Sequence, residues 1–496
     1  MSLSLLAENI SKAQEYIARK KPLMKSAKMR QRYHFMAEEG WLNDPNGLVC
    51  FRGKYHMFYQ YNPYDSFWGP MHWGHAVSKD LIHWEYLPVA LAPSEPYDNH
   101  RFGGCFSGSA IVHEDRLYLI YTGTANHGNG FVQTQCLAYS DDGITFVKDT
   151  GNPVLSAPDG YDPANFRDPK VWRHGDSFYL VCGSKKDNFG QALIFRSKNL
   201  REWTFLNVLA ESRGELGYMW ECPDFFPLGD KYVLMFSPMG VRERKTVYLV
   251  GDMNYDTGKF FYTTMGEIDW GFDYYAPQSF PDDKGRRLIV GWANAWDWMP
   301  WWKDWGPTYK EGWCGSFGIP REVRLCPDNT LQFVPVEELN LLRREKTSEC
   351  GLTLSPDAGP HSITAGDGVS FEIRLTIDLK RTTAKHFDLI LRASGQKKTV
   401  VRFDLEKAAL SVDRNDADGW SRGISRSPLR LRDDKTLDIC VYSDQSSVEL
   451  FTDNFQTVHS TNIFAGNDQN GNYLVSGDGV LFIRNLAAWG LETVMK

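Results

Sequence analysis

Short apolar runs alternate with polar positions over most of the chain, and this two-residue period is typical of β-strands. Between residues 33 and 335 the runs form a repeat. Each copy begins with a small polar or acidic residue, continues with an apolar run and a polar turn, and ends with a second apolar run that contains a tyrosine. The first residue lies eleven positions before that tyrosine in four copies, which begin at Asp44, Ser107, Asp168 and Glu221.

The turns inside the copies have the composition of β-hairpins, as in Arg52-Gly53 and Gly229-Asp230. A weaker fifth copy begins at Ala276-Pro277, and a polar segment such as 78–84 follows three of the hairpins. Each copy therefore has room for about four strands. Five such units predict a five-bladed β-propeller, and the length of the units favours this closed arrangement over a solenoid.

Two other patterns flank the repeats. Residues 1–32 have apolar positions at helical spacing followed by Lys and Arg, which predicts a short N-terminal amphipathic helix. Residues 336–349 are expected to form a linker helix, and plain alternation over residues 350–496 predicts a β-sandwich domain. The predicted fold class is all-β: a five-bladed β-propeller over residues 33–335, followed by a C-terminal β-sandwich.

Composition narrows the class of protein. The 496 residues exceed one ordinary domain, and the formal net charge of −7 argues against a nucleic-acid-binding surface. Nine cysteines without a Cys-x-x-Cys pair argue against a disulfide framework and a zinc site. The N-terminus lacks the apolar segment of a signal peptide, and no apolar run approaches membrane-spanning length. We expect a cytoplasmic protein without cofactor, metal or membrane partner; the sequence leaves homo-oligomer formation open.

The repeat has a chemical consequence. The first strand of each propeller blade lines the central channel, so equivalent positions meet on the axis. Asp44, Asp168 and Glu221 occupy the same position in three copies, and we expect their carboxyl groups to converge at one mouth of the channel. Like charges at close range cannot all ionise, so at least one pKa should rise. An ionised carboxylate beside a protonated one suits acid-assisted nucleophilic chemistry.

Four ordered motifs resemble those of glycoside hydrolase family 32, which contains invertases, sucrose-6-phosphate hydrolases, inulinases and levanases. They are Trp41–Gly47, Phe106–Ser109, Phe166–Pro169 and Trp220–Asp224. Two further segments, Tyr55–Pro63 and Asp444–Phe451, are also similar to the family, so the resemblance covers nearly the whole chain after residue 32. It implies a five-bladed propeller with a C-terminal β-sandwich, in agreement with the repeat.

The resemblance also implies roles for individual residues. Asp44 would be the nucleophile, Glu221 the general acid/base and Asp168 a transition-state stabiliser in a double displacement that cleaves terminal β-D-fructofuranosides with retention. Arg167 would hold its neighbour Asp168 ionised. The residues expected to bind the substrate are Trp41, Asn43, Gln60, Trp68, Phe106, Ser107, Arg167, Asp273, Tyr275 and Trp292.

The predicted function is hydrolysis of sucrose, sucrose 6-phosphate or short fructo-oligosaccharides. Two alternatives are a fructosyltransferase that uses the same site and a non-catalytic carbohydrate-binding propeller, because the fold alone does not decide function. The three acids favour an enzyme, since binding alone would not require them. Arg242, Arg244 and Lys245 are candidates for a phosphate site, although a solvated charge cluster is the favoured interpretation of them.

Overall fold

The computed structural model describes residues 4–241, 244–296 and 306–495. The chain divides into two compact units. Unit 1 comprises Met1–Ser26, Met36–Glu267 and Tyr275–Leu331. Unit 2 comprises Ala27–Phe35, Ile268–Tyr274 and Gln332–Lys496.

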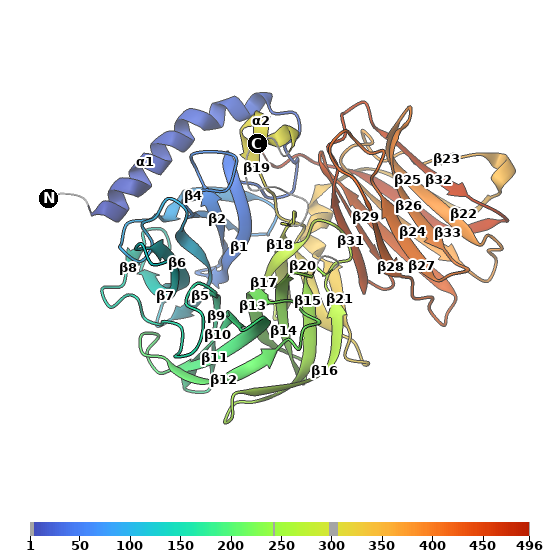
Figure 1. Cartoon of the computed structure of the whole chain (residues 1–496). Helices are drawn as coiled ribbons and strands as arrows, with labels where there is room; N and C mark the ends of the chain where they lie inside the picture. Colours follow the sequence, from blue (N-terminus) through green and yellow to red (C-terminus); the bar gives the residue numbers. More distant parts are fainter. Residues whose placement is uncertain (1–3, 242–243, 297–305, 496) are drawn as a thin grey trace. The chain divides into compact units, whose positions relative to one another are not determined.

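The described residues between 40 and 335 form five sheets (Figure 1). Apart from one short strand added to the first sheet, neighbouring strands in each sheet follow the chain order. The first sheet contains β1 Gly40–Phe51, β2 Lys54–Asn62, β3 His72–Ser78 and β4 Trp84–Leu91. The second contains β5 Gly104–His113, β6 Arg116–Asn126, β7 Phe131–Ser140 and β8 Val147–Lys148. The third contains β9 Phe166–His174, β10 Ser177–Lys186, β11 Phe189–Ser197 and β12 Thr204–Glu211.

The fourth sheet contains β13 Met219–Leu228, β14 Lys231–Met239, β15 Val247–Asn254 and β16 Lys259–Glu267. The fifth contains β17 Tyr275–Pro281, β18 Arg287–Trp292, β20 Arg321–Leu325 and β21 Leu331–Pro335. A short strand that the repeat does not predict, β19 Trp313–Cys314, follows the small helix α2 Pro307–Glu311 and adds to the first sheet parallel to β1.

The first strands of the five sheets lie toward the middle of unit 1 (Figure 1). Strand β1 packs against β5, β5 against β9, β9 against β13, and β13 against β17, which packs back against β1. Neighbouring sheets bury apolar faces against each other. The contact between β17 and β1 joins the last sheet to the first and closes the circle of blades. The predicted five-bladed propeller is confirmed.

Each of these first strands is interrupted in the same region. The ladder to the second strand shifts register at 42–45, 106–108, 167–170, 221–224 and 275–278. A bulge leaves residues unpaired and re-aims their side chains. The five irregularities therefore fall on the segments that carry the candidate site residues.

The prediction that the three acids share one ladder position is wrong in detail. Asp44 lies seven residues before Phe51, the last paired residue of β1, whereas Asp168 lies six residues before His174, the last paired residue of β9. In a regular strand an offset of one residue turns the side chain to the opposite face. The bulge in each strand and the left-handed backbone of Asp168, with φ of 66°, compensate for that offset.

The polar segments after three hairpins form one recurring turn. In each turn, a side-chain oxygen of Asp80, Asp142 or Asn199 accepts hydrogen bonds from the backbone amides two and three residues later. Short polar side chains that satisfy their own backbone favour turns over strands. The sequence repeat therefore extends beyond the hairpin, as predicted.

The predicted N-terminal helix is also present. Helix α1 Leu5–Lys20 begins where Ser4 Oγ accepts a hydrogen bond from Ala7 N at 3.3 Å, and it continues as a 3₁₀ helix over Lys21–Ser26. Its buried face packs on β4 and consists of Leu6, Ala13 and Ile17.

Unit 2 contains two six-stranded antiparallel sheets. One has the strand order β22 Arg343–Leu354, β33 Leu481–Leu491, β24 Phe371–Asp378, β29 Thr436–Ser443, β30 Ser447–Thr452 and β31 Thr457–Asn462. The other has the order β23 His361–Ser362, β32 Gly471–Ser476, β25 His386–Ser394, β26 Lys397–Asp404, β27 Ala409–Asp413 and β28 Ile424–Pro428. Residues from both sheets share one apolar core, as in a β-sandwich.

The predicted linker helix is shorter than expected. The structure has a 3₁₀ helix over Glu337–Leu342, and strand β22 already begins at Arg343. A further 3₁₀ turn covers Pro356–Ala358. The alternating charges and polar residues of 343–349 suit an exposed edge strand, which explains why their helical interpretation fails.

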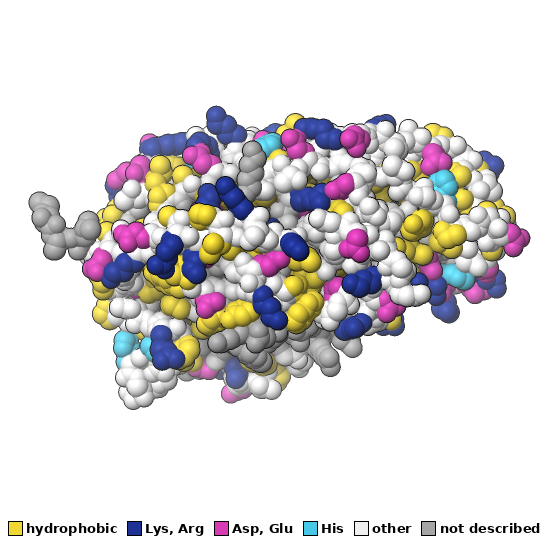
Figure 2. All heavy atoms as spheres, turned by 90° about the horizontal axis from the view of Figure 1, so that it is seen from above, with side chains coloured by type: hydrophobic (Ala, Val, Ile, Leu, Met, Phe, Trp, Pro, Cys, Tyr) yellow, Lys and Arg dark blue, Asp and Glu magenta, His cyan; other side chains and the backbone are white. Residues whose placement is uncertain are grey.

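On the face that Figure 2 shows, Lys and Arg side chains are interspersed with Asp and Glu side chains. Among the described helices, none has the length and apolar character needed to cross a bilayer.

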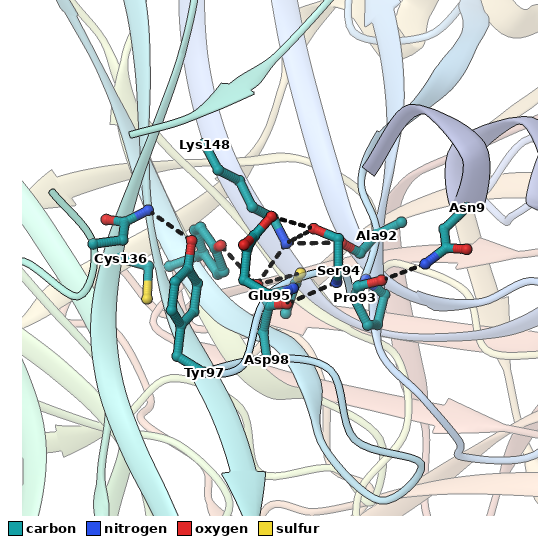
Figure 3. A network of polar contacts seen from close by, with 12 residues as sticks. Asn9, Ala92, Pro93, Ser94, Glu95, Tyr97, Asp98, Cys136 and Lys148 are labelled. Atoms are coloured by element: carbon teal, nitrogen blue, oxygen red, sulfur yellow. Dashed lines mark hydrogen bonds and ion pairs between the residues drawn. The ribbon is translucent and has the colours of Figure 1, made fainter. Parts of the chain in front are cut away.

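A buried ion pair supports the segment that joins the first two blades (Figure 3). Lys148 Nζ donates to Asp98 Oδ2 at 2.6 Å, to Ala92 O at 2.8 Å and to Ser94 Oγ at 2.9 Å. Asn9 of α1 donates to Pro93 O at 2.8 Å in the same segment. The network fixes the connection from β4 to β5, and β5 carries Ser107.

Replacing Lys148 by Met should lower the free energy of unfolding by about 3 kcal/mol, because Asp98 would remain buried without its cation. Urea denaturation measures this loss. Lys198→Met is the matched control, since Lys198 pairs with Asp176 on the exposed surface at 2.7 Å, and it should change stability little. Equal losses in the two variants would refute a structural role for the buried pair.

Candidate active site

Asp44 lies buried in β1, at the bulge that precedes Pro45. Its Oδ2 accepts a hydrogen bond from Ser107 Oγ at 2.6 Å and a weak one from Cys222 Sγ at 3.5 Å. Its Oδ1 is buried and accepts no hydrogen bond from the described residues. The carboxyl group of Asp44 is thus held in place mainly through Oδ2.

Glu221 lies in β13, and its side chain is 16% exposed. Arg167 Nη2 donates to Glu221 Oε1 at 2.9 Å, and Tyr275 Oη donates to Glu221 Oε2 at 2.5 Å. Strands β9, β13 and β17 therefore each contribute one member of this group. The carboxyl group is held by two donors and still reaches the surface.

Asp168 lies in β9 and is also buried. Its Oδ2 accepts a hydrogen bond from Cys222 N at 2.9 Å, and its own amide donates to Thr122 Oγ1 at 2.9 Å. The closest guanidinium nitrogen of Arg167 is 3.9 Å from Asp168 Oδ2, farther than the same residue lies from Glu221. Arg167 therefore pairs directly with Glu221, while its charge lowers the pKa of Asp168, as expected for a residue that holds Asp168 ionised.

The three carboxyl groups interact electrically. Burial raises the pKa of Asp44 to about 6, with a further contribution from the charge of Glu221, while the hydrogen bond from Ser107 opposes the rise. Burial also raises the pKa of Asp168 to about 7; Arg167 opposes this rise, and the charges of Glu221 and Asp44 add to it. The predicted rise of at least one pKa is confirmed.

Two predicted pocket residues sit beside Asp44 and are held rigidly. Asn43 Oδ1 accepts a hydrogen bond from Trp41 Nε1 at 2.8 Å, and both residues are buried. Gln60 Nε2 donates to Cys105 O at 2.8 Å, which ties β2 to the start of β5. These bonds fix the side chains on either side of the bulge in β1.

Aromatic rings border the same region. Trp68 and Phe106, both partly exposed, meet edge to face with ring centroids 6.0 Å apart. Trp292 packs against Trp41 at 6.0 Å and against Tyr275 at 6.4 Å. Amphipathic rings of this kind suit the apolar faces of a sugar. The sequence from 296 to 302 is also rich in aromatic residues, and 297–302 lie outside the described residues.

Asp273 belongs to unit 2, where its Oδ2 accepts hydrogen bonds from Arg414 Nη1 at 2.8 Å and from Asn462 N at 2.7 Å. Its side chain is buried. These bonds support a structural role for the carboxylate, and its predicted contact with the substrate stays a prediction.

Three residues that the motifs did not indicate as site residues contact the acids or Arg167. Cys222 contacts both Asp44 and Asp168, Thr122 fixes the backbone of Asp168, and Gln133 Oε1 accepts from Arg167 Nη1 at 3.3 Å. Burial raises the pKa of the Cys222 thiol well above its usual value, so it acts as a hydrogen-bond donor and not as a thiolate. The position of Cys222 directly after Glu221 was the one sequence feature that pointed to a role in the site.

The arrangement is suited to displacement at a sugar carbon. A carboxylate that Ser107 holds in place faces a region that also contains a partly exposed carboxyl group and a third acid with a raised pKa. Retaining glycosidases need a nucleophile and an acid/base close enough to act on the same bond. The geometry supplies all three carboxyl groups from β1, β9 and β13.

Two family models match the chain. The Glycosyl hydrolases family 32 N-terminal domain matches residues 34–335, and the family 32 C-terminal domain matches residues 338–490. The matched segments together include every predicted site residue.

Individual proteins are similar over nearly their whole length. A sucrose-6-phosphate hydrolase of Escherichia coli is 38% identical over 92% of this chain and 94% of its own. A sucrose-6-phosphate hydrolase of Zymomonas mobilis is 35% identical over 98% of this chain and 96% of its own. A solved structure of a Bombyx mori β-fructofuranosidase in complex with sucrose is 35% identical, covers 98% of both chains and has a TM-score of 0.82.

Proposed function

The chain belongs to glycoside hydrolase family 32 and is a retaining glycosidase of the β-fructofuranosidase and sucrose-6-phosphate hydrolase type, and we propose that it cleaves sucrose and sucrose 6-phosphate through Asp44, Glu221 and Asp168. The observation that carries this proposal is the grouping of the three carboxyl groups: Cys222 donates hydrogen bonds to both Asp44 and Asp168, and the charge of Glu221 acts on both of these acids. A carbohydrate-binding protein would not need these buried acids.

In the first step, Asp44 attacks the anomeric carbon of the fructosyl unit. A carboxylate oxygen of Asp44 forms the new bond, and the hydrogen bond from Ser107 to Oδ2 fixes the orientation of the carboxylate. Glu221 protonates the glycosidic oxygen as the bond to the leaving sugar breaks. The products of this step are the released sugar and a fructosyl ester of Asp44.

In the second step, water replaces the released sugar. Glu221 removes a proton from that water, which attacks the same carbon and frees Asp44. Tyr275 and Arg167 hold Glu221 in one place during both steps. Asp168 stabilises the positive charge that develops on the sugar ring in each transition state.

The raised pKa of Asp168 makes its contribution depend on pH near neutrality. Burial and the charges of Glu221 and Asp44 raise this pKa to about 7, so Asp168 retains its proton at a pH where an isolated acid would have lost it. Asp168 stabilises the positive charge of the transition state only after it has lost that proton, so its contribution should increase as the pH rises through this range.

Removing the Ser107 hydroxyl should move the acid limb of the pH profile. The bond from Ser107 lowers the pKa of Asp44, so in Ser107→Ala that pKa rises and the nucleophile is protonated at higher pH. The acid limb of kcat/KM should therefore shift upward by about one pH unit. Initial rates of sucrose cleavage between pH 4 and 8 would show the shift.

Ser109→Ala is the matched control for this profile. Ser109 lies two residues further along β5, is equally buried and donates to Pro169 O at 2.8 Å instead of to an acid. Its variant should keep the acid limb of the wild type. A limb that stays in place in Ser107→Ala as well would remove Asp44 from the role of the titrating nucleophile.

Discrimination between the two substrates depends on the leaving-group side. Arg244 Nη1 pairs with Glu267 at 3.3 Å, and Arg242 lies outside the described residues. Burial raises the pKa of Glu267 to about 7. Below that pH, Glu267 is mostly protonated and its ion pair with Arg244 is weaker. The ion pair of Arg244 gives only indirect support for a phosphate site. The proposed substrates therefore include both sucrose and sucrose 6-phosphate.

The comparison of kcat/KM for sucrose, sucrose 6-phosphate and the trisaccharide 1-kestose tests the proposed substrates. Cleavage of sucrose or its phosphate with release of free fructose supports hydrolysis. Glucose release that outruns fructose release would indicate transfer to another sugar instead. No cleavage of any of the three would refute the proposed substrates.

We assign the protein to the cytoplasm. All nine cysteines lie within the described residues and are free thiols, and six of them are buried. Reduced cysteines in this number are typical of a reducing compartment. Their state fits a substrate that is imported before cleavage.

A further inference from the structure

A separate cavity of about 480 Å³ lies within unit 1, at the other end of the strands that carry the acids. All five first strands contribute to it, through residues 48–50, 110–112, 170–174, 225–227 and 279–281. Along β1 and β13 these residues come at least four positions after the acids. At about 3.3 Å per residue, this places those residues about 13 Å along the strands from Asp44 and Glu221. On β9 the lining begins closer to the acids, at Lys170, two residues after Asp168.

Arg287, the first residue of β18, has its guanidinium group at this cavity. Its Nη1 donates one long hydrogen bond of 3.5 Å to Ser279 Oγ, and its guanidinium carbon lies 4.7 Å from the ring centroid of Phe226. It forms no ion pair with any described carboxylate. Burial lowers the pKa of Arg287 to about 10, and the charge of Asp224 opposes this shift.

The other charges of the interior are already matched. Lys170 Nζ pairs with Asp224 at 2.8 Å, and Asp224 also accepts hydrogen bonds from Ser279. Asp282 pairs with Arg286 at 2.7 Å. The remaining lining charges, Arg173 and Asp283, are exposed. Among the described cations of the lining, the partly buried Arg287 lacks a direct ion pair and shares only the more distant charge of Asp224, so it can still gain from a bound anion.

Aromatic side chains form much of the cavity wall. Trp172 Nε1 donates to Tyr255 Oη at 3.1 Å, and the ring of His174 stacks on Tyr255 with centroids 3.7 Å apart. Phe225 lies against Trp172 with centroids 5.3 Å apart. These contacts hold the rings in fixed positions, and fixed aromatic faces suit the apolar faces of a sugar ring.

We propose that this cavity is a second binding site for a small anionic sugar, a monosaccharide that carries a phosphate or a carboxylate group. Its anion would pair with the guanidinium of Arg287, whose planar fork matches either group in a bidentate manner. The sugar ring would lie against Trp172 and Tyr255. The volume exceeds what an inorganic anion requires and falls within the range of small-ligand sites.

The site does not depend on the reaction proposed for the three acids. None of its lining residues contacts Asp44, Asp168 or Glu221 in the described structure. Binding at the acids and binding at Arg287 can therefore be told apart by the residue on which each depends.

Calorimetric titration of the full chain with glucose 6-phosphate, glucuronate and glucose tests the proposal. Both anionic sugars should bind, and glucose should bind at least about tenfold more weakly. Arg287→Gln should weaken the binding of the anionic sugars by at least about tenfold. It should leave the kcat/KM for sucrose unchanged, which also shows that the variant folds.

Arg324→Gln is the matched control, because it removes the same charge from the adjacent strand β20, where Arg324 pairs with Glu322 away from the cavity. It should bind the anionic sugars like the wild type. Unchanged binding in Arg287→Gln, or equal affinity for glucose and the two anions, would overturn the proposal. So would the absence of any binding to the wild type.

A second measurement needs no variant. An arginine-specific dicarbonyl reagent modifies accessible guanidinium groups, and peptide mapping by mass spectrometry reports the modification of each arginine. Glucose 6-phosphate should protect Arg287 from the reagent and leave Arg324 unprotected. Equal modification of Arg287 with and without the sugar phosphate would contradict the site.

Discussion

Asp44→Asn should lower kcat for sucrose by about 10,000-fold and leave the fold intact. The amide cannot form the fructosyl ester, because it is not a nucleophile at the anomeric carbon. It can still accept the hydrogen bond from Ser107, so the packing around it should persist. Glucose release by the purified variant, together with its thermal unfolding midpoint, measures both effects.

Asp224→Asn is the control for this result. Asp224 is an equally buried acid on β13, but it pairs with Lys170 at the other end of the axial strands. Its variant should lose stability and keep most of the activity of the wild type. Activity of Asp44→Asn within tenfold of the wild type would mean that Asp44 is not the nucleophile.

Glu221→Gln should show a loss that depends on the leaving group. For sucrose we expect kcat to fall by about 1,000-fold, because the departing oxygen no longer receives a proton. For 4-nitrophenyl β-D-fructofuranoside the first step needs little acid assistance, so its rate should fall much less. Burst-phase kinetics with the two substrates would separate the first step from the second.

The control variant Glu267→Gln changes a different partly buried glutamate, whose partner is Arg244. It should affect both substrates alike. If Glu221→Gln also reduced the first step equally for sucrose and for the nitrophenyl fructoside, Glu221 would not be the acid of this reaction.

The blades were predictable because their signals are local. Two-residue alternation and hairpin turns such as Arg52-Gly53 depend on neighbouring residues alone. The recurring turn at Asp80 follows from one side chain and its own backbone. The repeat of these local features was enough to indicate five sheets closed into a ring.

The site was predictable only in part. The spacing of eleven residues drew attention to Asp44, Asp168 and Glu221, but their convergence depends on bulges and on the left-handed backbone at Asp168. Those features follow from packing between blades, which no single segment of sequence records. The spacing therefore identified the correct strands, although Asp44 and Asp168 do not occupy strictly equivalent positions in the strand ladders.

Non-local pairing explains the remaining differences. Asp273 has a partner at Arg414, and Arg167 pairs with Glu221 in preference to its own neighbour Asp168. Each choice depends on residues more than fifty positions away in the sequence. The place of Arg287 at the second cavity likewise becomes visible only when all five axial strands are assembled.

Trapping the covalent intermediate tests the central claim most directly. Glu221→Ala should form the ester rapidly from 4-nitrophenyl β-D-fructofuranoside and hydrolyse it slowly, because no base activates the water. After an acid quench, peptide mapping by mass spectrometry should find one fructosyl group on the peptide that contains Asp44. A fructosyl group on the peptide that contains Asp168 instead, or turnover without any labelled peptide, would contradict the account.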